Sequence, residues 1–148
     1  MDIVLLDDHG RLYLSPRIDD WKPLHDHGIS VIFDLDGDLD SGIPTTPNEV
    51  LYIYFPIYDE DLPDLQKLHA LAKLGAELVG HGQKVLSHCG MGFNRSALLA
   101  GLILIYLGFT GQEAVNLLRS RRPGALFNSV FCDYLLAIDG SGEAIGRG

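Results

Sequence analysis

The stretch that decides the fold is KVLSHCGMGFNRSALLAG, residues 84–101. Its apolar start predicts a buried strand, its glycines predict a tight loop, and its alanine- and leucine-rich end predicts a helix that begins near Arg95. A loop between a strand and a helix directs backbone N–H groups at one point, and the helix dipole favours negative charge there. This order of elements therefore predicts a binding site for an anion.

Two reactive side chains lie at the two ends of this loop. Cys89 ends the strand and Arg95 begins the helix, with five residues between them. They can face each other across one tetrahedral anion, which the guanidinium would clamp with two hydrogen bonds. Backbone amides and a nearby cation favour the thiolate form of cysteine, which is the nucleophile. The expected anion-binding residues are Gly90, Met91, Gly92, Phe93, Asn94 and Arg95.

The segment HCGMGFNRS, residues 88–96, resembles the His-Cys-x5-Arg-Ser/Thr signature of cysteine-based protein tyrosine phosphatases, and is nearest to their compact dual-specificity branch. The resemblance implies that Cys89 attacks phosphorus while Arg95 holds the phosphoryl oxygens. It also implies that Ser96 hydrogen-bonds the departing thiolate and that His88 supports the loop from behind. Neither a metal ion nor another cofactor is required in this family's reaction.

The leaving oxygen of a phosphoester needs a proton, and the segment YFPIYDEDLPD, residues 54–64, offers four acids. Members of the family of this size often carry the acid three positions after a proline that ends the preceding strand, which implies Asp59 here. Glu60 is the second choice. Asp61 lies just before an expected helix and is interpreted as its N-cap. After the first step the same acid, now a carboxylate, would activate water.

A second resemblance lies downstream in LRSRRPGALFNSVF, residues 118–131. Dual-specificity phosphatases carry there an arginine-proline turn and an asparagine that supports the signature loop. Arg122, Pro123, Asn128 and Phe131 fit that pattern. Arg119, Arg121 and Arg122 would either complement a helix dipole or steer an anionic substrate.

Three residues of the signature loop depart from the family pattern. Asn94 stands where glycine or serine is commoner, while Met91 and Phe93 make the loop bulkier and more apolar. The loop also has no lysine, which argues against the multiply phosphorylated inositol substrates of the family's lipid phosphatases. The choice among phosphotyrosine, phosphoserine or phosphothreonine, and a small phosphoester stays open.

Strand patterns alternate with helix patterns along the chain, which predicts an α/β fold in one domain. We expect a central, mostly parallel sheet of about five strands flanked by helices, with a helical C-terminal half. The phosphatase domain would span residues 1–138, and residues 139–148 would form a flexible tail. Expected strands lie at 3–8, 11–16, 29–38, 50–56 and 84–89, and expected helices at 17–28, 63–80, from 95, 110–122 and about 127–138.

Composition excludes several classes of function. A chain of 148 residues with a net charge of −9 lacks the basic surface of a nucleic-acid binder. The most apolar run, residues 96–108, is too short to span a membrane and predicts a buried helix instead. Two cysteines and no signal-peptide pattern favour a reducing cytoplasmic location, and a monomer is the simplest state. Cys132 is expected in the core, or else as a redox partner of Cys89.

The acidic stretch VIFDLDGDLD, residues 31–40, raises a competing hypothesis. A strand that ends in DxDG is typical of magnesium-dependent phosphatases of the haloacid dehalogenase type, with Asp34 as nucleophile. Asp38 replaces the threonine or valine of that motif, and the calcium-loop pattern also fails. We interpret the stretch as a solvated acidic turn after a core strand.

A third hypothesis is that the protein is a module that binds phosphate at the signature loop but hydrolyses phosphoesters poorly.

The sequence as a whole predicts a metal-independent phosphomonoester hydrolase that works through a phosphocysteine intermediate. Its expected substrate is a phosphorylated protein or a small phosphoester.

Overall fold

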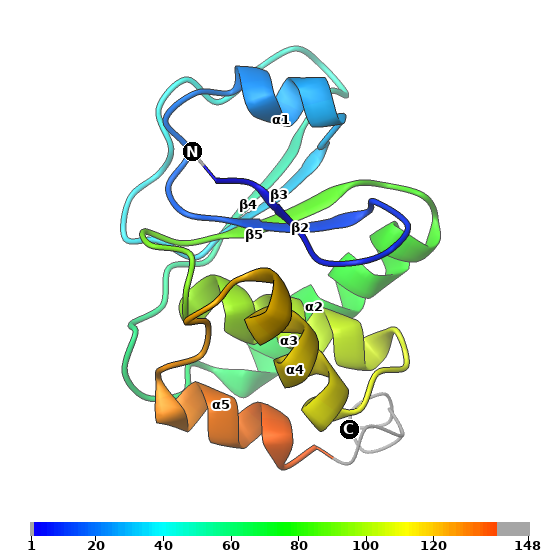
Figure 1. The fold of residues 1–148 in the computed structure, drawn as a ribbon. Helices are drawn as coiled ribbons and strands as arrows, with labels where there is room; N and C mark the ends of the chain where they lie inside the picture. Colours follow the sequence, from blue (N-terminus) through cyan, green and yellow to red (C-terminus); the bar gives the residue numbers. More distant parts are fainter. Residues whose placement is uncertain (1, 139–148) are drawn as a thin grey trace.

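The computed structural model describes residues 2–138, which form one five-stranded sheet with helices on both faces (Figure 1). The strand order is β1-β2-β5-β3-β4. Among the described strands β1 alone runs antiparallel to its neighbour, so the predicted mostly parallel sheet is confirmed. The strands are β1 (Val4–Leu5), β2 (Leu12–Ser15), β3 (Val31–Asp34), β4 (Leu51–Tyr54) and β5 (Val85–His88).

Within residues 2–138, five helices are divided unequally between the two sides of the sheet. Helix α1 lies on one face, and the other four pack together on the opposite face (Figure 1). The predicted helical C-terminal half is confirmed. The helices are α1 (Lys22–His27), α2 (Leu65–Gly80), α3 (Arg95–Tyr106), α4 (Gly111–Arg121) and α5 (Ser129–Leu136).

The three central strands, β2, β5 and β3, are buried on both sides because their side chains alternate between two cores, whereas the edge strands β1 and β4 are partly exposed. In β3, Val31 and Phe33 join the larger core with the helices α2 to α5, while Ile32 joins a smaller core that includes Leu24 of α1. Parallel strands covered on both faces need such continuous apolar sequences. Helix α3 passes through the centre of the larger core, and its residues 96–105 are all buried. The predicted buried central helix is therefore confirmed.

Most helix ends follow the sequence signals, but α1 begins at Lys22 rather than at the predicted residue 17. Gly28 ends α1 with a φ of 76°, and Thr110 caps α4 in a complete capping box with Glu113. The predicted cap Asp61 is wrong. Helix α2 begins at Leu65, two residues after Pro63, and Asp64 is its N-cap because its side chain accepts the Lys67 N–H at 3.1 Å.

The parallel strands bring three loops to one edge of the sheet. In the register of the sheet, His88 at the end of β5 lies beside Ser15 of β2 and Asp34 of β3. The signature loop that follows β5 therefore lies between the segments that follow β2 and β3. Within residues 2–138 no helix combines the length and apolar character that crossing a bilayer requires. The predicted flexible tail, residues 139–148, lies outside the described residues.

Candidate active site

The signature loop wraps around the sulfur atom of Cys89. This side chain is 2% exposed at the end of β5, and its Sγ accepts the Gly92 N–H at 3.3 Å. Ser96 Oγ lies 3.2 Å from the same sulfur atom. Ser87 Oγ donates to the Ser96 carbonyl at 2.9 Å, which fixes the first turn of α3 against the strand. The structure thus brings the predicted nucleophile and the predicted hydroxyl donor into contact.

Gly92 is required by the way the loop packs on the segment after β2. Its φ of 74° lies in the left-handed region, and a Cβ at this position would be 2.8 Å from the Pro16 nitrogen. The backbone N–H of Arg17 also donates to the Gly90 carbonyl at 3.2 Å. A residue with a side chain at position 92 would therefore push the loop away from β2.

The guanidinium of Arg95 has contacts on one side and an unpartnered donor on the other within residues 2–138. Its Nη1 lies 3.5 Å from the Ile57 carbonyl and 3.6 Å from Asp36 Oδ1. Its Nε is buried and has no hydrogen-bond partner among residues 2–138, and a Cβ on Gly90 would lie 3.2 Å from Nη2. The Nε and Nη2 donors therefore form the edge that faces the loop, which is the geometry for two hydrogen bonds to one anion.

The first turn of α3 also lacks the usual partners. Asn94 is its N-cap residue, but the Asn94 side chain makes no cap hydrogen bond, and no acid lies in the first turn. A cation at the first helical position opposes the helix dipole unless an anion is present. The free helix N-terminus, the Arg95 edge and the loop amides together define an anion site at the sulfur atom of Cys89.

Asp59 is joined to the signature loop by two asparagines. Asn94 Nδ2 donates to Asp59 Oδ2 at 2.9 Å, and Asn128 Nδ2 donates to Asp59 Oδ1 at 2.8 Å. The Asn128 backbone N–H in turn donates to Asn94 Oδ1 at 2.9 Å. The described contact of Glu60 with this group is made through its backbone carbonyl, at 3.1 Å from Asn128 Nδ2. The structure thus places Asp59 beside the loop, and it gives the unusual Asn94 a structural role.

Arg122 supports the far side of the loop. Its guanidinium donates to the carbonyls of Met91 at 2.9 Å and Gly92 at 3.3 Å, and lies 4.1 Å from the centre of the Phe93 ring. The Leu126 N–H donates to the Phe93 carbonyl at 2.8 Å. Arg122 is thus engaged by the loop rather than free to steer a substrate.

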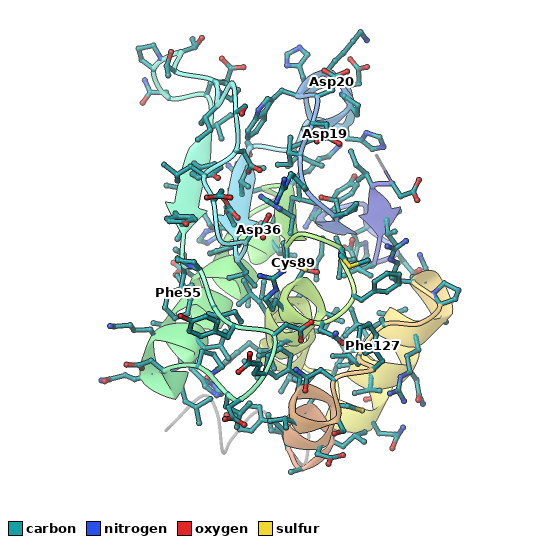
Figure 2. All side chains as sticks on the ribbon, turned by 90° about the vertical axis from the view of Figure 1, so that its left-hand side faces the viewer. Asp19, Asp20, Asp36, Phe55, Cys89 and Phe127 are labelled. Carbon is teal, nitrogen blue, oxygen red and sulfur yellow. The ribbon has the colours of Figure 1, made fainter. Side chains whose placement is uncertain are left out.

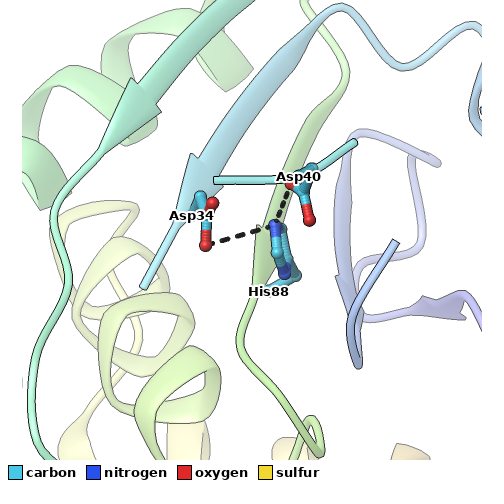
Figure 3. A group of neighbouring side chains, drawn as sticks. All are labelled: Asp34, Asp40 and His88. Carbon is cyan, nitrogen blue, oxygen red and sulfur yellow. Dashed lines mark hydrogen bonds and ion pairs between the residues drawn. The ribbon is translucent and has the colours of Figure 1, made fainter. Parts of the chain in front are cut away.

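His88 belongs to a buried polar group behind the loop (Figure 3). Its Nε2 lies 2.7 Å from Asp40 Oδ2 and 3.4 Å from Asp34 Oδ1, so Nε2 carries the donated proton. The Tyr52 hydroxyl joins both carboxylates. Burial raises the pKa of Asp34, and burial together with Asp34 raises the pKa of Tyr52. His88 is therefore tied to the acidic stretch that follows β3.

The interpretation of that stretch as a solvated turn is wrong. Asp34 is fully buried and Asp36 is 8% exposed, whereas Asp38 is exposed. The reason is the strand order, because β3 lies next to β5 and its end reaches the signature loop. Buried Asp34 accepts from the Asp36 N–H and from Tyr52, which leaves it inaccessible as a nucleophile.

The sequence did not point to two residues of the site, Asp36 and Arg17. Asp36 contacts Arg95 and also Arg17, whose Nε lies 3.3 Å from Asp36 Oδ2. In Figure 2 Cys89 lies near the middle of the drawn face, with Asp36 and Phe127 on either side. The alternating acids of residues 34–40 were a signal, but only the order of strands shows which of them reaches the loop.

Among residues 2–138, one group of side chains could hold a metal ion. The ligand atoms of Asp34, Asp40 and His88 all lie within 4.8 Å of one another. These atoms already bind each other and Tyr52, as expected for a hydrogen-bonded network. The two cysteines are free, and Cys132 Sγ accepts from Arg119 Nη2 at 3.3 Å.

Comparison with known proteins agrees with this geometry. Residues 12–139 match the family model of the dual specificity phosphatase catalytic domain, and the chain belongs to this family. Tyrosine-protein phosphatase CDC14 of Saccharomyces cerevisiae is 36% identical over 67 residues, which are 45% of this chain and 12% of that protein. The matched region thus spans a small part of that relative's length.

Solved structures share the fold. A mouse putative dual specificity phosphatase, crystallised with zinc tungstate, has a TM-score of 0.79 at 21% identity, with 97% of this chain and 90% of that chain covered. Tk-PTP in its active form has a TM-score of 0.69 at 26% identity, with 90% and 95% covered. These structures support the single-domain cysteine-phosphatase architecture.

Proposed function

We propose that this chain hydrolyses phosphomonoesters through a phosphocysteine on Cys89, without a metal ion. The observation that carries the proposal is the Nε of Arg95, which is buried beside the loop that encloses the sulfur atom and has no hydrogen-bond partner in the described part of the chain. A buried donor without a partner costs free energy, so such a donor is expected where a ligand will bind. The family membership supports the same reaction.

The first step transfers the phosphoryl group to sulfur. The thiolate of Cys89 attacks phosphorus, the S–P bond forms, and the bond from phosphorus to the ester oxygen breaks. Asp59 gives its proton to that oxygen, so the alcohol leaves neutral. Arg95 and the loop amides bind the three phosphoryl oxygens, where they are fixed before the reaction begins.

The second step releases phosphate. The Asp59 carboxylate takes a proton from water, the water oxygen attacks phosphorus, and the S–P bond breaks to return the thiolate. The Ser96 hydroxyl donates a hydrogen bond to the departing thiolate, consistent with the 3.2 Å separation. Asp59 can act while it is held, because a carboxylate has about four lone-pair sites and the two asparagines use two.

A phosphate-binding module without useful turnover is the second candidate. Both Asp59 oxygens accept amide hydrogens in this structure and the residue is exposed, so proton delivery depends on how Asp59 meets a bound substrate. Such a module would bind phosphate or vanadate but would not release product. The burial of Asp34 argues against the magnesium-dependent mechanism at that side chain.

The test is hydrolysis of p-nitrophenyl phosphate in excess chelator by the parent protein, Cys89→Ser and Cys132→Ser. Cys132 is the matched control, because it is also a free, buried cysteine. The proposal expects turnover in the parent and in Cys132→Ser, and none in Cys89→Ser. Turnover that survives in Cys89→Ser would overturn it, and vanadate binding without turnover would favour the binding module.

We further propose phosphorylated proteins as the substrates, with phosphotyrosine among the groups accepted, and a cytoplasmic location. Both follow from the family and from the need of the mechanism for a reduced thiol.

A further inference from the structure

Asp36 contacts two positive side chains beside the anion site, Arg95 and Arg17. Its Oδ1 lies 3.6 Å from Arg95 Nη1, and its Oδ2 lies 3.3 Å from Arg17 Nε. The Gly37 N–H donates to Asp36 Oδ1 at 2.8 Å and holds the carboxylate in place. The side chains of Asp36 and Arg95 are 11% and 18% exposed, so water screens their contact less than it would on an open surface, whereas Arg17 is 58% exposed and its contact with Asp36 is more strongly screened.

The third cation that meets the loop is also engaged. Arg122 donates to the carbonyls of Met91 and Gly92, and its side chain is 18% exposed. The other positive side chains of residues 2–138 contact groups elsewhere in the fold. These are Arg11, Lys22, Lys67, Lys73, Lys84, Arg119 and Arg121.

The surface near the site is apolar and acidic. Met91 in the loop is 69% exposed, and Phe127, whose ring packs on Phe93, is 70% exposed. Tyr58, beside Asp59 in the chain, is 82% exposed. The acids Asp38, Asp59, Glu60 and Asp61 are exposed in the two segments that contact the site.

We propose that the site selects phosphotyrosine peptides whose phosphoryl group has neutral or basic neighbours, and that Asp36 is a specificity-determining residue that rejects a second anion. The proposal rests on the proposed function and names its substrate class. One phosphoryl group satisfies the Arg95 edge and the loop amides. A neighbouring aspartate or second phosphate would lie near acids, while Arg17 is paired with Asp36 and Arg122 with the loop carbonyls, so the hydration that it lost would not be matched by a new unshared cation.

The test compares phosphotyrosine peptides that differ only at the flanking positions, with lysine, serine or aspartate on both sides. At low ionic strength kcat/KM should be about fivefold or more higher for lysine flanks than for aspartate flanks, within the range of charge steering. The ratio should shrink as salt is added. A ratio near one, or a preference for aspartate flanks, would overturn the proposal.

The residue is tested with Asp36→Asn, which keeps the shape and removes the charge. Glu77→Gln is the matched control, because Glu77 is exposed on α2 near the end that leads into β5, opposite the site. Asp36→Asn should lower the lysine-to-aspartate ratio by about twofold or more, and Glu77→Gln should leave it unchanged. Equal ratios in the parent and Asp36→Asn would show that Asp36 does not determine the peptide preference.

The ratio is measured within each variant, so a general loss of activity in Asp36→Asn does not affect it. If that variant fails to fold, the salt dependence of the parent's ratio still decides the peptide preference. Failure of the proposed function has a different signature, because p-nitrophenyl phosphate would then not be hydrolysed. If p-nitrophenyl phosphate is hydrolysed but kcat/KM is the same for lysine and aspartate flanks, the proposed peptide preference is wrong while the proposed reaction stands.

Discussion

Replacing Asn94 by alanine should separate Asp59 from the signature loop. Asn94 is 2% exposed, and its side chain makes two hydrogen bonds, to Asp59 at 2.9 Å and from the Asn128 N–H at 2.9 Å. A neutral hydrogen bond contributes about 1 kcal/mol, and one to a charged group about 1.5–3 kcal/mol. Because Asp59 is exposed, the lower figure applies to it, and Asn94→Ala should reduce the free energy of unfolding by about 2–3 kcal/mol.

The catalytic effect of Asn94→Ala should depend on the leaving group. General acid catalysis raises a rate by about 10²–10⁴-fold. If Asp59 is no longer held in place, the rate should fall by about 10–100-fold. Phenyl phosphate, whose leaving oxygen needs a proton, should be hydrolysed much more slowly, and p-nitrophenyl phosphate should be affected less. Asp59→Asn should show the same pattern, and the double variant should lose little more than Asp59→Asn alone.

The matched control is Asn116→Ala on α4, whose side chain accepts a hydrogen bond from Gln112 at 2.9 Å, within that helix. It should keep both rates. Equal losses on the two substrates in Asn94→Ala, or full additivity with Asp59→Asn, would refute the role of Asn94 in holding the acid.

Three further predictions concern the signature loop, the cap of α4 and a half-buried histidine of α2. Gly92→Ala places a Cβ 2.8 Å from the Pro16 nitrogen at a residue with a left-handed backbone conformation. It should lower the free energy of unfolding in urea by about 1–3 kcal/mol and abolish turnover. Unchanged turnover would contradict the packing argument. Thr110→Ala breaks the capping box and should cost about 1 kcal/mol with kcat unchanged, whereas Thr110→Ser should restore the stability. Burial lowers the pKa of His69 below its usual 6.5, so the unfolded chain binds a proton on His69 more tightly than the folded chain does. The free energy of unfolding should therefore fall as the pH drops below about 6.5. His69→Gln should flatten this pH dependence of urea midpoints, and an equal slope in both proteins would show that other groups cause it.

Local patterns predicted the parts of the site that are close together in the chain. The loop from Cys89 to Ser96 is determined by glycine positions and by the change from strand to helix, which are short-range features. The cap of α4 at Thr110 was predicted for the same reason. The cap of α2 was placed at Asp61 because Pro63 suits a first helical position, but the helix begins after it.

Contacts between distant segments could not be predicted. The acidic stretch reaches the loop because β5 lies between β2 and β3, and a single sequence does not show which strands are neighbours. For the same reason Asn94 was noted only as a departure from the family pattern. Its contacts with Asp59 and Asn128 join segments 35 and 34 residues away.

The central claim is that the reaction passes through a phosphoryl group on Cys89. The most direct measurement is a rapid denaturing quench of the parent and of Asp59→Asn during turnover of p-nitrophenyl phosphate, followed by mass spectrometry of the peptides. The account predicts a phosphorylated peptide that contains Cys89, more abundant in Asp59→Asn because the second step is slowed. A phosphoryl group on Asp34 or Asp36, or steady turnover with no labelled peptide, would contradict it.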